Sequence, residues 1–151
     1  MRGFTLIELV TVLVLVGVLS AVALPSLSGI QSFRATEFRA EVVAGLRFAQ
    51  KVAVSHRRLV CAAFASNSLT LSIDHDRNGT CDGRAINLPG RTSNVIQGAG
   101  AGANFTTVPQ ALFFQPDGRI FDAGGNTVSL SLTIDGVTVL LEGRTGYVGA
   151  P

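Results

Sequence analysis

A long apolar run near the amino terminus constrains this chain more than any other feature. Residues 4–24 contain 16 apolar side chains out of 21, and they follow a short leader that carries one charge, Arg2. As a helix the run would measure about 31 Å, enough to cross a hydrocarbon core of ~30 Å. Arg2 favours keeping the leader in the cytoplasm and exporting the rest of the chain. No other run in the sequence has this length, which excludes a polytopic membrane protein.

One carboxylate, Glu8, lies inside this run. A secretory signal peptide, with a small-residue cleavage site at residues 21–23, and a plain membrane anchor are two explanations of the run. Neither explanation requires a carboxylate in the run. Inserting a carboxylate into a bilayer costs roughly 2.5 to 3.5 kcal/mol at the centre and less near the edge. If the chain is cut after Gly3, the new α-amino group of Phe4 becomes a cation at a similar depth. Glu8 of one copy can then neutralise the Phe4 amine of a neighbour.

Residues 3–10, GFTLIELV, resemble the type III signal of type IV pilins and type II secretion pseudopilins. The resemblance covers about 25 residues, from the short basic leader to the end of the apolar helix. It implies that a prepilin peptidase cuts between Gly3 and Phe4 and methylates the new amino terminus of Phe4. It also implies that Glu8 makes an assembly contact between subunits.

From residue 25 the pattern becomes that of an amphipathic helix, which we expect to extend over residues 25–57 and to end near His56. Pro25 predicts a kink or local melting where the two helical parts join. Residues 34–58 include six basic and two acidic side chains, an excess of four positive charges. A solvated helix face is the simplest explanation, and acidic lipid, neighbouring subunits or DNA are the alternatives. The apolar stripe recurs at helical spacing at Phe38, Val42, Leu46, Ala49 and Ala53.

Residues 58–151 have the pattern of short strands separated by turns. Predicted strands at 59–64 and 69–73 form a hairpin, residues 111–114 turn back into 119–121, and residues 128–134 alternate strictly before a turn into 137–141. The chain is therefore expected to have an α+β, pilin-like fold. A leader (1–3) precedes a membrane-spanning and assembly helix (4–24), an amphipathic helix (25–57) and an antiparallel β-sheet domain (58–151) on which the second helical half packs.

Two further motifs resemble a narrower group. FQPDGR at residues 114–119 and GRTGY at residues 143–147 resemble the GspH/FimT group of minor pilins and pseudopilins, which implies a priming or tip position in a filament. The cysteine pair and residues 145–147 are also similar to minor pilins of mannose-sensitive haemagglutinin pili. Some members of the group bind DNA through a Gly-Arg-x-Arg sequence. Here the second Arg is replaced by Gly146, which leaves Arg144 as the candidate DNA contact.

Two cysteines and an acidic turn are the remaining candidate sites. Export places Cys61 and Cys81 in an oxidising compartment, and a disulfide between them would contribute roughly 3 kcal/mol in a chain-entropy estimate. Four oxygen-bearing residues fit the opening of a calcium loop, but Ala85 stands where its bidentate Glu belongs, so an Asx-rich turn is favoured. These calcium candidates are Asp74, Asp76, Asn78 and Asp82.

The sequence favours a structural role over catalysis. Its only imidazoles, His56 and His75, lie beside no nucleophile motif and lack zinc-finger spacing, so we expect no enzyme activity and no cofactor. The leading hypothesis is a minor pilin of a type IV pilus, held in the bacterial inner membrane with its carboxyl-terminal domain in the periplasm. The expected partners are other pilin or pseudopilin subunits, prepilin peptidase and inner-membrane lipid. A minor pseudopilin of type II secretion is the first alternative, and a DNA-binding minor pilin is the second, with nucleic acid the less favoured partner.

Overall fold

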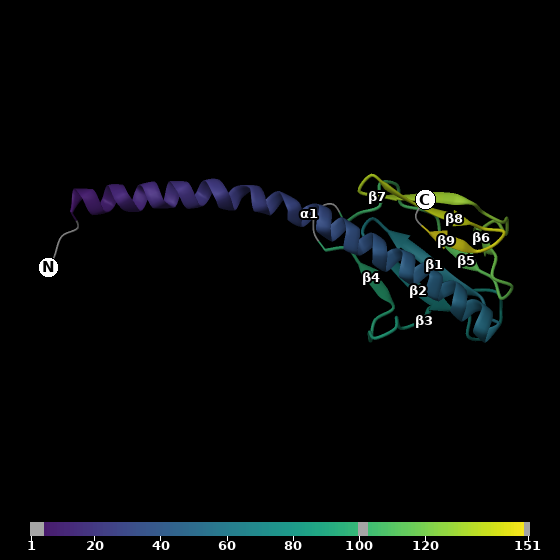
Figure 1. Cartoon of the computed structure of the whole chain (residues 1–151). Coiled ribbons are helices and arrows are strands. Elements are labelled where there is room, and N and C mark those ends of the chain that lie inside the picture. The colour runs from purple at the N-terminus through teal and green to yellow at the C-terminus, as the bar shows by residue number, and fades with distance from the viewer. Residues whose placement is uncertain (1–4, 100–102, 150–151) are drawn as a thin grey trace.

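A computed structural model describes residues 5–99 and 103–149, and for residues 22–31 it describes the backbone alone. One helix, α1 (Leu6–His56), has 51 residues, and only its carboxyl-terminal part is covered by a β-rich region (Figure 1). At 1.5 Å per residue α1 is about 76 Å long. The predicted α+β fold, a long amino-terminal helix packed on antiparallel sheets, is confirmed.

The local melting expected at Pro25 does not occur in α1. Helical backbone continues from Leu6 to His56 without interruption. A proline removes one backbone donor, but the helix extends for many residues on both sides, and each further residue adds a hydrogen bond at little cost. The helix ends at His56, where the sequence predicts an end. Arg57 then adopts a left-handed conformation (φ 50°), and its N–H donates to the carbonyl of Ala53.

The larger of two sheets has six strands, all paired antiparallel. Its order is β3-β2-β1-β5-β6, and β4 pairs with β2 outside this path. The predicted hairpin is confirmed as β1 and β2, which pair from Val60 opposite Ile73 to Ala65 opposite Ser68. The bounds are β1 (Val60–Ala65), β2 (Ser68–Ile73), β3 (Arg84–Ala85), β4 (Val95–Gln97), β5 (Leu112–Phe114) and β6 (Ile120–Phe121).

The smaller sheet has the order β7 (Leu130–Ile134), β8 (Val137–Glu142) and β9 (Tyr147–Gly149). The turn predicted between β7 and β8 is present, and both of its residues have positive φ, 48° at Asp135 and 75° at Gly136. This backbone matches the twist of a two-residue hairpin. Strands β3, β4 and β9 were not predicted, because each has only two or three residues and shows no alternation of its own.

The core lies between the second half of α1 and the two sheets. All five residues of the predicted apolar stripe are buried on α1, and they contact side chains from both sheets. Phe105 joins the helix to the larger sheet, since its ring makes edge contacts with Phe38 and Phe64, both at 5.4 Å between centroids. The face of α1 that packs is therefore the one the sequence indicates.

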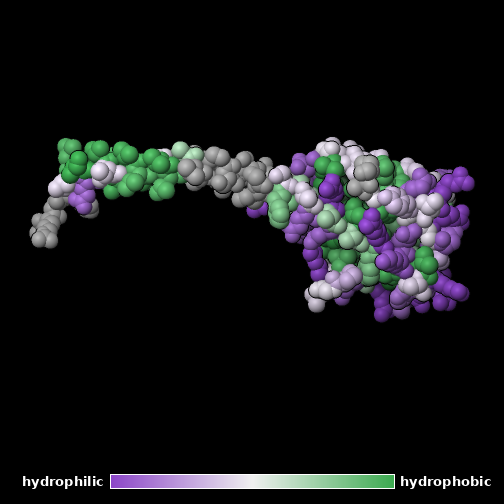
Figure 2. All heavy atoms as spheres, in the orientation of Figure 1, coloured by the Kyte–Doolittle hydropathy of each residue, from purple (hydrophilic) through white to green (hydrophobic). Residues whose placement is uncertain are grey.

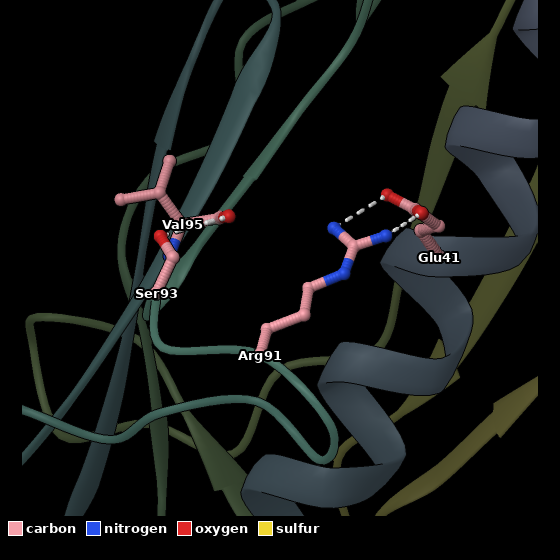
Figure 3. Close-up of polar contacts among 4 residues, drawn as sticks. All are labelled: Glu41, Arg91, Ser93 and Val95. Atoms are coloured by element: carbon pink, nitrogen blue, oxygen red, sulfur yellow. Dashed lines mark hydrogen bonds and ion pairs between the residues drawn. The ribbon is translucent and has the colours of Figure 1, made fainter.

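Polar contacts fix loops and strands to the outside of the same helix. Arg91, in the loop before β4, directs both terminal guanidinium nitrogens at the carboxylate of Glu41 on α1 (Figure 3). Farther along, the Nε of Arg47 donates to the carbonyl of Val148 in β9 at 2.8 Å. These contacts fix the loop before β4, in the larger sheet, and β9, in the smaller sheet, to one helix.

Candidate assembly surface on the amino-terminal arm

The first part of α1 projects away from the β-region, and we name residues 5–21 the arm. Every described residue of the arm is exposed. Figure 2 shows the arm as predominantly hydrophobic, whereas hydrophilic side chains gather over the β-region. A patch of this kind on a protein marks a surface that another molecule or a membrane covers. Eleven large apolar side chains are 45% to 81% exposed: Leu6, Ile7, Leu9, Val10, Val12, Leu13, Val14, Leu15, Val16, Val18 and Leu19.

The hydroxyl groups of the arm are satisfied within the helix. Thr5 is the N-cap, and its Oγ1 accepts a hydrogen bond from the N–H of Glu8 at 3.4 Å. Thr11 Oγ1 donates to the carbonyl of Ile7 at 3.0 Å, and Ser20 Oγ donates to that of Val16 at 2.7 Å. Because these groups bond back to their own helix, they do not weaken the apolar character of the surface.

Glu8 is the exception among the polar groups of the arm. It occupies the third helical position, where a negative charge is favoured by the helix dipole. Its carboxylate has no ion-pair partner among residues 5–99 and 103–149. The predicted cleavage and methylation residues, Gly3 and Phe4, lie outside the described residues.

No helix among the described residues reaches the length and apolarity that a membrane crossing requires.

The predicted disulfide between Cys61 and Cys81 is present. It joins β1 to the segment after β2, and the two Cα atoms are 6.1 Å apart. Ser72 stands opposite Cys61 in the β1–β2 ladder, and the Cys81 sulfur lies 3.9 Å from the Ser72 carbonyl. The bond therefore closes the loop that follows the hairpin onto the middle of the sheet.

The acidic turn of residues 74–83 is organised around the carboxylate of Asp74. Asp74 is buried, and its two carboxylate oxygens accept the N–H groups of Asn78 and Gly79, at 3.2 and 2.9 Å. Within the described residues, no three His, Cys, Asp or Glu side chains lie close enough to hold a metal ion, and this includes Asp74, Asp76 and Asp82. Asp74 instead organises its own loop, in the manner of the Asx-rich turn.

The two carboxyl-terminal motifs meet each other on α1. The Gln50 side-chain amide donates to the carbonyls of Gly118, in the first motif, and Thr145, in the second, at 3.2 and 3.4 Å. Gly146 has a φ of 71°, and a Cβ there would overlap the Gln50 amide and the Gly118 carbonyl. The backbone of these motifs is therefore fixed by packing. Arg144 is exposed between β8 and β9, with no second Arg beside it in the motif.

The fold and the arm together define the architecture of the protein. An antiparallel β-region packs on one end of a long helix, and the other end of that helix is exposed and apolar. Residues 1–24 match a family model described as the prokaryotic N-terminal methylation motif. This motif indicates a type IV pilin-like protein that is a substrate of prepilin peptidase and assembles with other subunits. Comparisons with curated proteins and with solved structures found no match.

Proposed function

We propose that this protein is a minor pilin that acts in type IV pilus assembly, as a priming or tip subunit. The observation that carries the proposal is an exposed apolar arm inside the N-terminal methylation motif, with one carboxylate, Glu8, that has no ion-pair partner among the described residues. Such an arm suits two environments in turn, the inner membrane before assembly and the interior of a filament afterwards. The β-region would remain in the periplasm until the subunit is incorporated.

The apolar surface of the arm supplies the driving force for assembly. Complete burial of one Leu, Ile or Val side chain contributes about 1.5–3 kcal/mol. Eleven such residues, each already partly covered by the helix, would together contribute on the order of 10 kcal/mol before the entropic costs of association. This energy favours bundling but does not align the helices. Pairing of Glu8 with the Phe4 amine of a neighbour would supply the alignment, because a carboxylate surrounded by apolar helices requires a partner.

A minor pseudopilin of type II secretion remains the alternative, because the same arm serves either filament. The GspH/FimT resemblance includes both kinds of subunit. DNA uptake through Arg144 receives no support from the motif geometry, since the structure uses the surrounding motif to anchor β9 to α1.

The test is complementation of a deletion strain with the full chain. Wild type, Glu8→Gln and Glu37→Gln are compared for surface pili and for export of a type II substrate. Glu37 is the matched control, since it is an exposed carboxylate on the same helix outside the arm. We expect Glu8→Gln to reduce pili at least tenfold and Glu37→Gln to leave them unchanged. Equal piliation by both variants would refute the role of Glu8, and loss of export with normal piliation would establish the pseudopilin alternative.

A further inference from the structure

A basic groove lies where α1 ends, at the opposite end of the helix from the arm. Its volume is about 670 Å³, and its walls come from the last turns of α1, from the segments that follow α1 and β2, and from β3. Five basic residues on these four segments line it: Lys51, His56, Arg58, His75 and Arg84. Two neutral hydrogen-bonding side chains, Ser55 and Asn87, complete the polar part of the lining.

The groove contains positive charge without a compensating carboxylate. No Asp or Glu is among its lining residues. The ion pairs within the described part of the chain are Arg91 with Glu41 and Arg119 with Asp117, so the cations of the groove have no acidic partner there. The adjacent Asp74 is outside the lining and makes no ion pair with them, since it is buried and both of its carboxylate oxygens accept hydrogen bonds from its own loop. Asp76 and Asp82 are exposed and lie outside the lining.

One side of the groove is already ordered. Arg58 donates from Nη1 to the carbonyl of His75, and the same nitrogen lies 3.3 Å from His75 Nδ1. By contrast, the side chains of Lys51 and Arg84 make no hydrogen bond or ion pair with any described residue. The groove therefore has two cations without a described partner, Lys51 and Arg84, and one that is held by a hydrogen bond, Arg58.

We propose that this groove binds the phosphate groups of an extended polyanion. Three permanent cations, Lys51, Arg58 and Arg84, come from different segments and surround a volume several times that of one phosphate, which suits successive groups along a chain. The phenyl ring in the lining, Phe48, is partly buried against the core, which limits the aromatic surface available for base stacking. Recognition would therefore be of the backbone, without sequence preference.

The position of the groove argues against a membrane surface as the source of the phosphates. Ala21, the last residue of the arm, and His56 are 35 residues apart on one helix, which corresponds to about 52 Å. With the arm in a bilayer, headgroups of that bilayer would lie far from the groove. The inference goes beyond the proposed function and does not depend on it, because the groove is formed by the β-region and the end of α1.

The experiment measures fluorescence anisotropy of a labelled 20-base-pair duplex with the full chain in a non-ionic detergent. Three neutralised phosphates predict a slope of about −2.7 in log K against log salt, which is about 40-fold weaker binding at 200 mM than at 50 mM. For Lys51→Ala/Arg84→Ala, one remaining contact predicts only about a 3.5-fold change between these salt concentrations. The control Arg34→Ala/Arg39→Ala removes the same charge from α1 outside the groove and should retain the steep slope.

Three competitors identify the ligand chemistry, and thermal unfolding with an intact disulfide verifies that each variant is folded. Unlabelled duplex should displace the probe, whereas inorganic phosphate at the same phosphate concentration and anionic phospholipid vesicles should not. Equal weakening by the two double variants would show that only net charge matters and would overturn the proposal. So would the lack of binding at 50 mM salt, or displacement by poly-glutamate as effective as by duplex, which would assign the groove to an acidic protein segment. Arg144→Ala, tested alongside, should leave binding unchanged.

Discussion

Gly146→Ala tests the junction that joins the two carboxyl-terminal motifs to α1. Two separate costs arise. The first is conformational, because a φ of 71° is unfavourable for alanine by roughly 1–2 kcal/mol. The second is steric, because the new methyl group would overlap the Gln50 amide and the Gly118 carbonyl. Gln50 can rotate away at the expense of two long hydrogen bonds, but the Gly118 carbonyl is backbone within a tight turn and must shift.

The steric part is the larger of the two. Overpacking of a close contact costs about 1–3 kcal/mol, and the loss of the Gln50 hydrogen bonds adds about 1 kcal/mol. The total expected loss of unfolding free energy is therefore about 3–6 kcal/mol. For a β-region of this size, each kcal/mol lowers Tm by about 4–8 °C. The decrease in Tm should accordingly exceed 12 °C.

Gly136→Ala is the matched control, because Gly136 has nearly the same φ, 75°, and a Cβ there would meet nothing within 4 Å. It should show only the conformational cost. Both variants are measured in the full chain, oxidised, by circular dichroism during thermal unfolding. In a Gln50→Ala background, Gly146→Ala should reduce the unfolding free energy by about 1 kcal/mol less, because the new methyl group then overlaps only the Gly118 carbonyl. If Gly146→Ala is no more destabilising than Gly136→Ala, the packing argument is refuted.

Three other expectations are tested by equilibrium unfolding. Replacing Cys61 and Cys81 by Ser should cost about 3 kcal/mol, and a loss below 1 kcal/mol would contradict the loop-entropy argument. Arg91→Ala should cost at most about 1 kcal/mol, and less in 1 M salt, because its ion pair is 48% and 26% exposed; a loss independent of salt would contradict this. The Arg119 backbone N–H, and then its guanidinium, lower the pKa of Asp117, so Asp117 adds stability at neutral pH that is lost as pH falls through that pKa. Asp117→Asn should therefore be less stable than wild type at pH 7, and the difference should shrink as the pH falls below 3.8, the ordinary pKa of this carboxyl; a difference that did not change with pH would exclude this linkage.

Periodicity predicted the helical face and the long strands well. Val42, Leu46 and Ala49 recur at helical spacing and are fully buried, because the spacing that marks them in the sequence is the spacing that aligns them on one face. The strict alternation in residues 128–134 likewise identified β7, although the pairing begins only at Leu130. Such patterns can be recognised in the sequence alone, because they do not depend on which element the helix or strand packs against.

Features that depend on distant pairing had no such signal. β3 contains only Arg84 and Ala85, and its position is set by hydrogen bonding to β2. The basic groove depends on the same pairing, since β3 brings Arg84, and the end of β2 brings His75, beside the end of α1. The excess of basic residues in 34–58 indicated half of the groove, but no spacing rule connects it to residues 75 and 84.

The tie between Arg47 and Val148 has a consequence for how the molecule is made. These residues are 101 positions apart, so α1 is synthesised long before the strand that completes its packing. The face of α1 that carries Val42, Leu46 and Ala49 must therefore wait uncovered while the sheets form. Contacts of such long sequence separation are slow to close. Completion of the fold would thus be paced by the synthesis of β9, and any chain cut short before β9 would leave part of this apolar helix face exposed.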